Sequence, residues 1–385
     1  MEIKQIYEVV NNAQKDVLGE KAITLNEDLS NIVDVGNEVF NANSFDAFTK
    51  KLVDHIGRVV FVVRKYVGRA PSVVMDAWEY GSVLEKIRAE MPEAVENETW
   101  ELEDGESYDP NIFHAPQVSA KFYNKYTTFE VDISVTEEQL KSAFSGVQQL
   151  NSFLSMIYNE VDKSLQVKTD LLVMRTMNNF IAETIHDDYG TDALNSKSGV
   201  KAINLLYLYN QRYSQSLTKD KAMEDKDFIR YASYMIKLYL ARIQNMSTLF
   251  NIGKRARFTP KEDLHLVMLA DFKSGADVFL QSETFHNELS ALPNAEEVAY
   301  WQGTGTDFTF GNVSKISVKT TEGNEITLDG VLAFAFDRDA LGVSNWKRKV
   351  TSNYNSKAEF TNLFYKQKAG YFNDFNENGI VFFIQ

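Results

Sequence analysis

"TEEQLKSAFSGVQQLNSFLSMIYNEVDKSLQVKTDLLVMRTMNNFIAETI", residues 136–185, carries the strongest helical pattern in the chain. Thr136 and Gln139 have the T-x-x-Q spacing of a capping box, with two glutamates between them in the first turn, where the helix dipole favours acidic groups. Apolar side chains then recur every three or four residues: Leu140, Ala143, Phe144, Val147, Leu150, Leu154, Ile157, Val161, Leu165, Leu172, Met177, Phe180 and Ile185. From Asn151 to Ile185 the rise is about 50 Å, which is long for a globular helix. The sequence therefore predicts one long helix that forms the backbone of the molecule.

An acidic segment lies upstream of this helix. MPEAVENETWELEDGESYDP, residues 91–110, contains eight carboxylates and neither lysine nor arginine. Pro92, Pro110 and Pro116 indicate an extended, peripheral conformation, because proline cannot donate to a helix or a central sheet ladder. Residues 121–135, KFYNKYTTFEVDISV, alternate as a strand does. Together these stretches predict a long two-stranded arm, and because an isolated ribbon is marginal in water, the arm needs a surface to lie on.

We expect the acidic arm to contact another subunit. Its candidate contact residues are Glu93, Glu96, Glu98, Trp100, Glu101, Leu102, Glu103, Asp104 and Tyr108. Basic residues elsewhere could receive it, because complementary charge fixes the orientation of partners: Arg58, Arg64, Lys65, Arg69, Lys347, Arg348 and Lys349. The same pairing could also form within one chain, and these cations could alternatively contact phosphates.

The remaining sequence mixes helical and strand patterns. Residues 1–43 are polar and asparagine-rich, and they indicate an arm with a little helix and no core. The other segments follow in order: a short helix at 85–91, helices through 201–251, an apolar strand at 264–270 and, from residue 298, strands separated by glycine turns. The last fifty residues are typical of two or three strands. We therefore expect an α+β chain with extended appendages.

Composition restricts the function. The 385 residues include 44% hydrophobic and 24% charged side chains, as in ordinary globular proteins. No apolar run has the length of a membrane span, and the charged N-terminus differs from a signal peptide, so we expect a cytoplasmic protein. The absence of cysteine excludes disulfides and thiolate chemistry. The net charge of −14 argues against nucleic-acid binding as the main activity.

The sequence offers no convincing catalytic, metal or cofactor site. No two of the five histidines have a metal-ligand spacing. The glycines of residues 303–311 lack the lysine and serine of a phosphate-binding loop. A glycosidase needs two acids at a fixed separation in a rigid cleft, which a proline-bounded arm does not provide. We expect a protein that is not an enzyme and needs no cofactor.

The order of these features resembles the major capsid protein of tailed bacteriophages, the Hong Kong 97 phage fold, especially in short-tailed phages. Six blocks carry the resemblance, which covers roughly residues 44–385: FDAFTKKLVDHIGRVV, MPEAVENETWELEDGE, FHAPQVSAKFYNKYTTFEVDISVTEEQLKSAF, EDLHLVMLAD, GVLAFAFDRDALGV and FNENGIVFFI. It implies an N-terminal arm with its junction (1–73) and an extended E-loop region (74–134). It further implies a peripheral domain with a spine helix (135–190 and 345–370) and an axial domain (191–344 and 371–385).

The resemblance also implies a function. The chain would self-assemble, as hexamers and pentamers, into an icosahedral head shell that encloses double-stranded DNA without sequence-specific binding. Portal, scaffold and decoration proteins would be its partners. It would be part of the virion after assembly in the host bacterial cytoplasm, without contact to a membrane. Two alternatives remain open, the shell of an encapsulin-type nanocompartment and a binding module that does not assemble.

Overall fold

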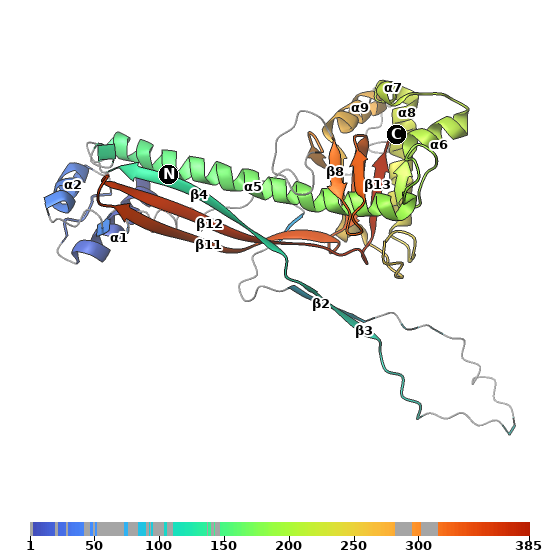
Figure 1. Ribbon diagram of the computed structural model, residues 1–385, viewed down its shortest axis with the longest axis horizontal. Helices are drawn as coiled ribbons and strands as arrows, with labels where there is room; N and C mark the ends of the chain where they lie inside the picture. Colours follow the sequence, from blue (N-terminus) through green and yellow to red (C-terminus); the bar gives the residue numbers. More distant parts are fainter. Residues whose placement is uncertain are drawn as a thin grey trace.

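A computed structural model shows an elongated molecule with a mixed domain at one end (Figure 1). The structure describes residues 3–19, 22–27, 30–41, 47–48, 51, 73–75, 84–89, 92, 94, 104–105, 111–136, 138–139, 142, 147–281, 295–301 and 315–385. The dominant element is the helix α5 (Val147–Tyr189), whose 43 residues correspond to about 65 Å. The long helix predicted from the sequence is thereby confirmed. The capping box forms upstream of it, because Gln139 N donates to Thr136 Oγ1 (3.3 Å) and Thr136 N donates to Gln139 Oε1 (3.1 Å).

A four-stranded sheet runs along α5 (Figure 1). Its order is β1-β11-β12-β4, with β1 parallel to β11 and the other pairs antiparallel. One sheet face packs against the helix because inward side chains such as Leu363 and Tyr365 are fully buried, and outward ones alternate with them. The strands are β1 (Val74–Met75), β4 (Tyr126–Thr136), β11 (Leu341–Asn355) and β12 (Phe360–Asn373).

The mixed domain is built on a five-stranded sheet of order β5-β13-β10-β6-β7. All seven residues of β10 are buried, since both sheet faces are covered. Phe334 and Phe336 join the core under α5, whereas Ala333 and Ala335 join a second core on the helical side. The strands are β5 (Ala202–Asn204), β6 (Leu264–Leu269), β7 (Glu296–Val298), β10 (Val331–Asp337) and β13 (Gly379–Phe383). The helices are α6 (Leu205–Tyr213), α7 (Lys219–Ala222), α8 (Lys226–Arg242) and α9 (Ala270–Gln281), with a 3-10 turn at Lys261–Asp263.

The N-terminal segment is more ordered than the sequence suggested. Helices α1 (Ile3–Leu18) and α2 (Ile32–Asn41) lie at the end of the molecule opposite the mixed domain (Figure 1). Val10, Val35 and Val39 are buried, so this arm has a small core of its own. The sequence did not predict this core, because its apolar clusters are short and each covers only one face of a helix.

A two-stranded ribbon leaves the body near the mixed domain (Figure 1). It consists of β2 (Leu84–Ala89) and β3 (Val118–Tyr123), paired antiparallel. The helix predicted at 85–91 is therefore wrong, because a run this short does not distinguish helix from strand by periodicity. The strand predicted over 121–135 is also divided: β3 belongs to the ribbon, whereas β4 starts at Tyr126 and pairs with β12.

A small hairpin, β8 (Ile316–Lys319) and β9 (Glu325–Leu328), covers part of α5. Thr321 N donates to Glu183 Oε1 (2.6 Å), and Asn324 Nδ2 lies 2.8 Å from His186 Nε2. The middle of α5 packs against the sheet on one side and against other elements around it. Four consecutive or neighbouring side chains are therefore buried there: Leu172, Val173, Met174 and Met177. Within the described part of the chain, no helix is both long and apolar enough to cross a membrane.

Candidate assembly surfaces

The β2–β3 ribbon has two chemically different faces. Its register places Lys86 opposite Lys121 and Leu84 opposite Tyr123, and these partly buried residues form the inner face. The alternate positions form an outer face that is exposed to solvent. The outer residues include Glu85, Ile87, Ala89, Val118, Ala120 and Phe122, of which Ile87 and Phe122 are each 63% exposed. Strand alternation therefore aims the cations at the body and apolar side chains away from it.

The inner cations are paired with acids of the body. Lys121 Nζ lies 2.9 Å from Asp374 Oδ1, and Lys86 Nζ lies 3.6 Å from Asp374 Oδ2. Arg88 bridges two acids, with Nη1 2.6 Å from Glu377 Oε1 and Nη2 2.9 Å from Asp339 Oδ2. We call these six residues the ribbon anchor: Lys86, Arg88, Lys121, Asp339, Asp374 and Glu377.

Two acids of the ribbon anchor, Asp374 and Glu377, are nearly buried, so their pKa values depend on burial and on the neighbouring cations. The side chains of Asp374 and Glu377 are 3% and 4% exposed. Burial favours the neutral form of Asp374, but the hydrogen bond from Lys121 and the charge of Lys86 outweigh it, so its pKa lies below the ordinary value. For Glu377 burial prevails, and its pKa is raised despite the charge of Arg88. Burial likewise lowers the pKa of Lys86, against the attraction of Asp374.

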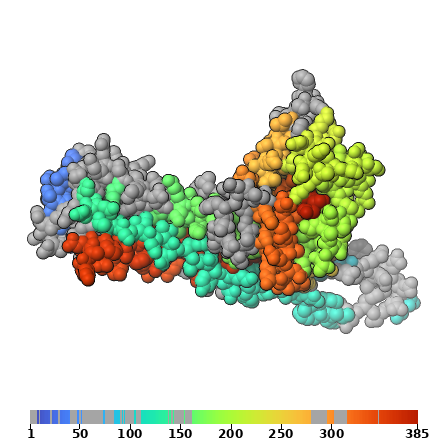
Figure 2. Space-filling view, turned by 45° about the horizontal axis from the view of Figure 1, so that its top comes forward, coloured from blue at the N-terminus to red at the C-terminus, as the bar shows by residue number. Residues whose placement is uncertain are grey.

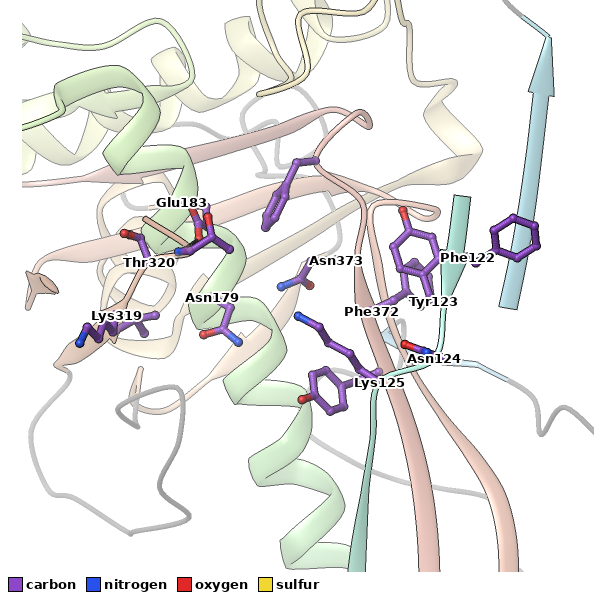
Figure 3. Close-up of a pocket in the computed structure, with 14 residues that line it drawn as sticks. Phe122, Tyr123, Asn124, Lys125, Asn179, Glu183, Lys319, Thr320, Phe372 and Asn373 are labelled. Atoms are coloured by element: carbon purple, nitrogen blue, oxygen red, sulfur yellow. Dashed lines mark hydrogen bonds between the residues drawn. The ribbon is translucent and has the colours of Figure 1, made fainter. Parts of the chain in front are cut away.

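Two pockets flank the root of the ribbon. One, of about 340 Å³, lies between the β3–β4 junction, α5 and the β8–β9 hairpin. In Figure 3, Tyr123 and Phe372 lie together beside β3, whereas Asn179 and Glu183 belong to α5. The second pocket, of about 490 Å³, is bordered by Arg88 and Ala89 of the ribbon and by two acids of the ribbon anchor, Asp339 and Glu377. Between the pockets, the root contacts the body through the ion pairs and the Tyr123–Phe372 ring contact, whose centroids are 5.1 Å apart.

A second surface is the outward face of the four-stranded sheet. The register of β11 and β12 places Lys347 opposite Lys368 and Lys349 opposite Lys366. Like charges directly opposite each other destabilise a sheet. On β4 the neighbouring Glu130 pairs with Lys366 at 3.3 Å, and Lys368 Nζ lies 3.7 Å from the centroid of the Tyr126 ring. We call Lys347, Lys349, Lys366 and Lys368 the lysine face.

The structure separates the basic run that the sequence presented as one cluster. Lys347 and Lys349 are exposed on the lysine face, but Arg348 is opposite the buried Gln367, on the sheet face that α5 covers. Arg348 therefore lies on the opposite sheet face from Lys347 and Lys349, because neighbouring strand residues point to opposite faces. In Figure 2 these late strands and β4 line one side of the elongated part.

Most other predicted contact residues lie outside the described residues. These are Arg58, Arg64, Lys65, Arg69, Glu93, Glu96, Glu98, Trp100, Glu101, Leu102, Glu103 and Tyr108. Asp104 is described, as an exposed turn residue. Lys366 and Lys368 were not among the predicted contact residues, although the alternating "KQK" at 366–368 indicates two lysines on one strand face. The ribbon anchor was not predicted either, and its two halves are separated by more than 200 residues of sequence.

No group of three or more metal-ligating side chains occurs in the portion of the chain that the structure describes. The arrangement instead offers an exposed, partly apolar outer face of the ribbon and the basic lysine face of the sheet. A basic surface orients a partner of complementary charge. The geometry of the two faces suits association between large protein surfaces.

The long helix over a long sheet, the mixed domain at one end and the protruding ribbon are the features that the sequence resemblance leads us to expect of a capsid-shell subunit. The chain belongs to the Phi29-like phage major capsid protein family, whose model matches residues 10–383. It is thus a phage capsid protein that assembles into the shell of the virion, and its family is one of structural proteins. The predicted fold class and function are confirmed.

Solved capsids are also similar in structure. A chain of the Staphylococcus phage Andhra capsid has 14% identity and a TM-score of 0.49, with 84% of this chain and 86% of that chain covered. A chain of the cyanophage P-SCSP1u capsid has 9% identity and a TM-score of 0.43, with coverage of 82% and 86%. Because both scores are below 0.5, the family assignment rests on the sequence match. The sequence matches no curated protein.

Proposed function

We propose that this protein forms an icosahedral head shell from hexamers and pentamers around double-stranded DNA. The match to the capsid family over residues 10–383 is the observation that carries this proposal. In this proposal the protein acts without catalysis or a cofactor and assembles in the host bacterial cytoplasm. Portal, scaffold and decoration proteins complete the particle.

The domain boundaries of the proposal follow the chain order. Residues 1–73 form the N-terminal arm and its junction, and residues 74–134 form the E-loop region. The peripheral domain comprises 135–190 and 345–370, and the axial domain comprises 191–344 and 371–385. The position of α5 against β11 and β12, and of β13 within the five-stranded sheet, supports this division.

The acidic arm is proposed to lie on the lysine face of an adjacent subunit. Two like-charged pairs, Lys347 with Lys368 and Lys349 with Lys366, are unfavourable in the isolated sheet, although Glu130 offsets part of the charge of Lys366. A segment with eight carboxylates and no cation supplies the opposite charge. Trp100, Leu102 and Tyr108 would add apolar contact, and Arg58, Arg64, Lys65 and Arg69 remain further proposed partners.

The test is assembly of the protein expressed alone and with a scaffold protein, followed by light scattering and negative-stain microscopy. We expect closed shells, and a monomer under all conditions would contradict the proposal. In the arm variant, Glu98, Glu101 and Glu103 are changed to Gln and Asp104 to Asn, which should prevent assembly of a folded subunit.

A matched control removes four carboxylates elsewhere, at the exposed residues Asp220, Glu224, Glu262 and Asp271. This control has the same net charge as the arm variant and should assemble normally. Normal shells from the arm variant would refute the role of the arm. Failure of both variants would instead attribute the effect to net charge.

A further inference from the structure

Among the described residues, the contacts that hold the β2–β3 ribbon to the body are concentrated on its inner face. Its outer face is exposed, and pockets of about 340 and 490 Å³ lie on either side of its root. A two-stranded ribbon is marginally stable by itself and does not hold its own orientation. The inner face, with Lys86, Arg88 and Lys121, must therefore carry most of the positioning.

The inner face of the ribbon carries a repulsion that an acid of the body relieves. Lys86 and Lys121 are directly opposite each other, and such like-charged pairs oppose strand pairing. Asp374 lies between them, with one carboxylate oxygen near each ammonium group. Lys86 also donates to the Asp339 carbonyl oxygen and lies 4.7 Å from the centroid of the Phe372 ring. Asp374 thus stabilises both the pairing of the two strands and the position of the ribbon on the body.

The body presents these acids from a preformed turn. Asp374 N donates to Ala340 O (2.6 Å), and Glu377 N donates to Asp374 O (3.1 Å). Asn376 N donates to Asp374 Oδ1 (3.2 Å). The turn between β12 and β13 is thereby held by the body's own hydrogen bonds. Arg257 Nε lies 3.9 Å from Glu377 Oε1, which partly compensates that charge without the ribbon.

We propose that Asp374 and Glu377 are positioning residues that set the direction of the β2–β3 ribbon, and hence of the acidic arm that it carries. This inference rests on the proposed docking of the arm on an adjacent subunit. If the ribbon swings away, Asp374 loses its ion pairs with Lys86 and Lys121 and Glu377 loses its ion pair with Arg88, so three ion pairs are broken together. The anchor therefore holds the ribbon in one orientation before any neighbour is bound.

The absence of cysteine permits a direct measurement of ribbon direction. Spin labels are attached after Ala120→Cys on the outer face of the ribbon and Ser216→Cys in the loop between α6 and α7, both exposed positions. Pulsed electron paramagnetic resonance then reports the distance distribution in the unassembled subunit. We expect one narrow peak for the labelled parent and a broadened or shifted distribution for Asp374→Asn with Glu377→Gln.

A second variant distinguishes loss of the ion pairs from misfolding of the body. Lys86→Gln with Lys121→Gln removes charge from the ribbon alone and should reproduce the broadening, whereas Asp374→Glu should retain the narrow peak. Lys197→Gln is a matched control, because Lys197 is 43% exposed and paired with Asp192, much as Lys121 is 42% exposed and paired with Asp374. This control should leave the distance unchanged.

Assembly rates distinguish this inference from the proposed docking. We expect the anchor variants to assemble more slowly, whereas the arm variant should fail to assemble with its ribbon distance unchanged. An unchanged distance in both anchor variants would overturn the inference and leave the docking proposal standing. A broadened distance with parental assembly rates would overturn the positioning role. Normal shells from the arm variant would refute the docking itself.

Discussion

Lys349 and Lys366 are directly opposite each other on β11 and β12, and both are exposed on the same sheet face. A second such pair, Lys347 and Lys368, follows along the strands. A sheet that evolved only for stability would place an opposite charge or a neutral side chain at one of the two positions. The arrangement is consistent with a surface that is completed by an acidic partner.

The first prediction concerns this lysine face. Lys349→Gln should stabilise the isolated subunit by roughly 0.2–1 kcal/mol, because it removes a cross-strand repulsion. The same change should slow assembly, because it removes a charge that the acidic arm contacts. Thermal unfolding and light scattering measure the two effects. Lys357→Gln, in the exposed turn between β11 and β12, is the control and should change neither. A slower assembly that accompanies lower stability would point to misfolding instead.

The second prediction concerns acid. The pKa of Asp374 is depressed in the folded state, so its contribution to stability is present above its unfolded pKa of about 3.9 and is lost as the pH falls through the folded value. Glu377 has a raised pKa, so its ionisation disfavours the folded state as the pH rises. Titration below pH 4 should therefore release the ribbon, visible as broadening of the spin-label distances. The double variant Asp374→Asn with Glu377→Gln should already be broadened at neutral pH and should change less in this range. Equal broadening in both proteins would contradict this prediction.

The third prediction concerns the junction of α5 with the five-stranded sheet. Phe180 is 1% exposed, and its ring packs against Phe334 and Phe375 at centroid distances of 5.6 and 5.3 Å. Phe180→Ala should lower the free energy of unfolding by about 3–5 kcal/mol.

A fourth prediction tests the same junction from the opposite side. A Cβ added at Gly379 would lie 2.4 Å from Phe180 Cε1. Gly379→Ala should therefore cost about 1–3 kcal/mol through overpacking. In a protein that already carries Phe180→Leu, Gly379→Ala should lower the free energy of unfolding by less. A double-mutant cycle from denaturant unfolding would measure this difference. Additive effects would show that the two residues do not share this space.

The fifth prediction concerns the end of α5. Asp188 accepts from Lys201 N, Ala202 N and Lys201 Nζ, at 2.7, 2.7 and 2.8 Å, and both side chains are less than a tenth exposed. Asp188→Asn should destabilise the protein by about 3 kcal/mol because it weakens the pairing of a buried ammonium group. Asp187→Asn, at the 28% exposed neighbour, should cost less. Chemical denaturation distinguishes the two, and equal losses would contradict this ranking.

The sequence by itself determined the elements whose signal is local and long. Apolar spacing over residues 136–185 predicted α5, because a stripe repeated over many turns has no alternative explanation. The strand β6 was predicted from a compact apolar run, and the terminal strands from their strand-like pattern. A helix was predicted at residues 85–91, by contrast, although Leu84–Ala89 form β2, since so short a segment carries too little periodicity.

Only the tertiary structure decided which charges meet. Strand pairing turned Arg348 away from Lys347 and Lys349, and it brought Lys366 and Lys368 beside them. The chain path then placed Lys121 against Asp374, 253 residues further along the sequence. Local sequence encodes the face of a strand on which a side chain lies, but the neighbour opposite it depends on register and topology, which buried contacts throughout the molecule determine together.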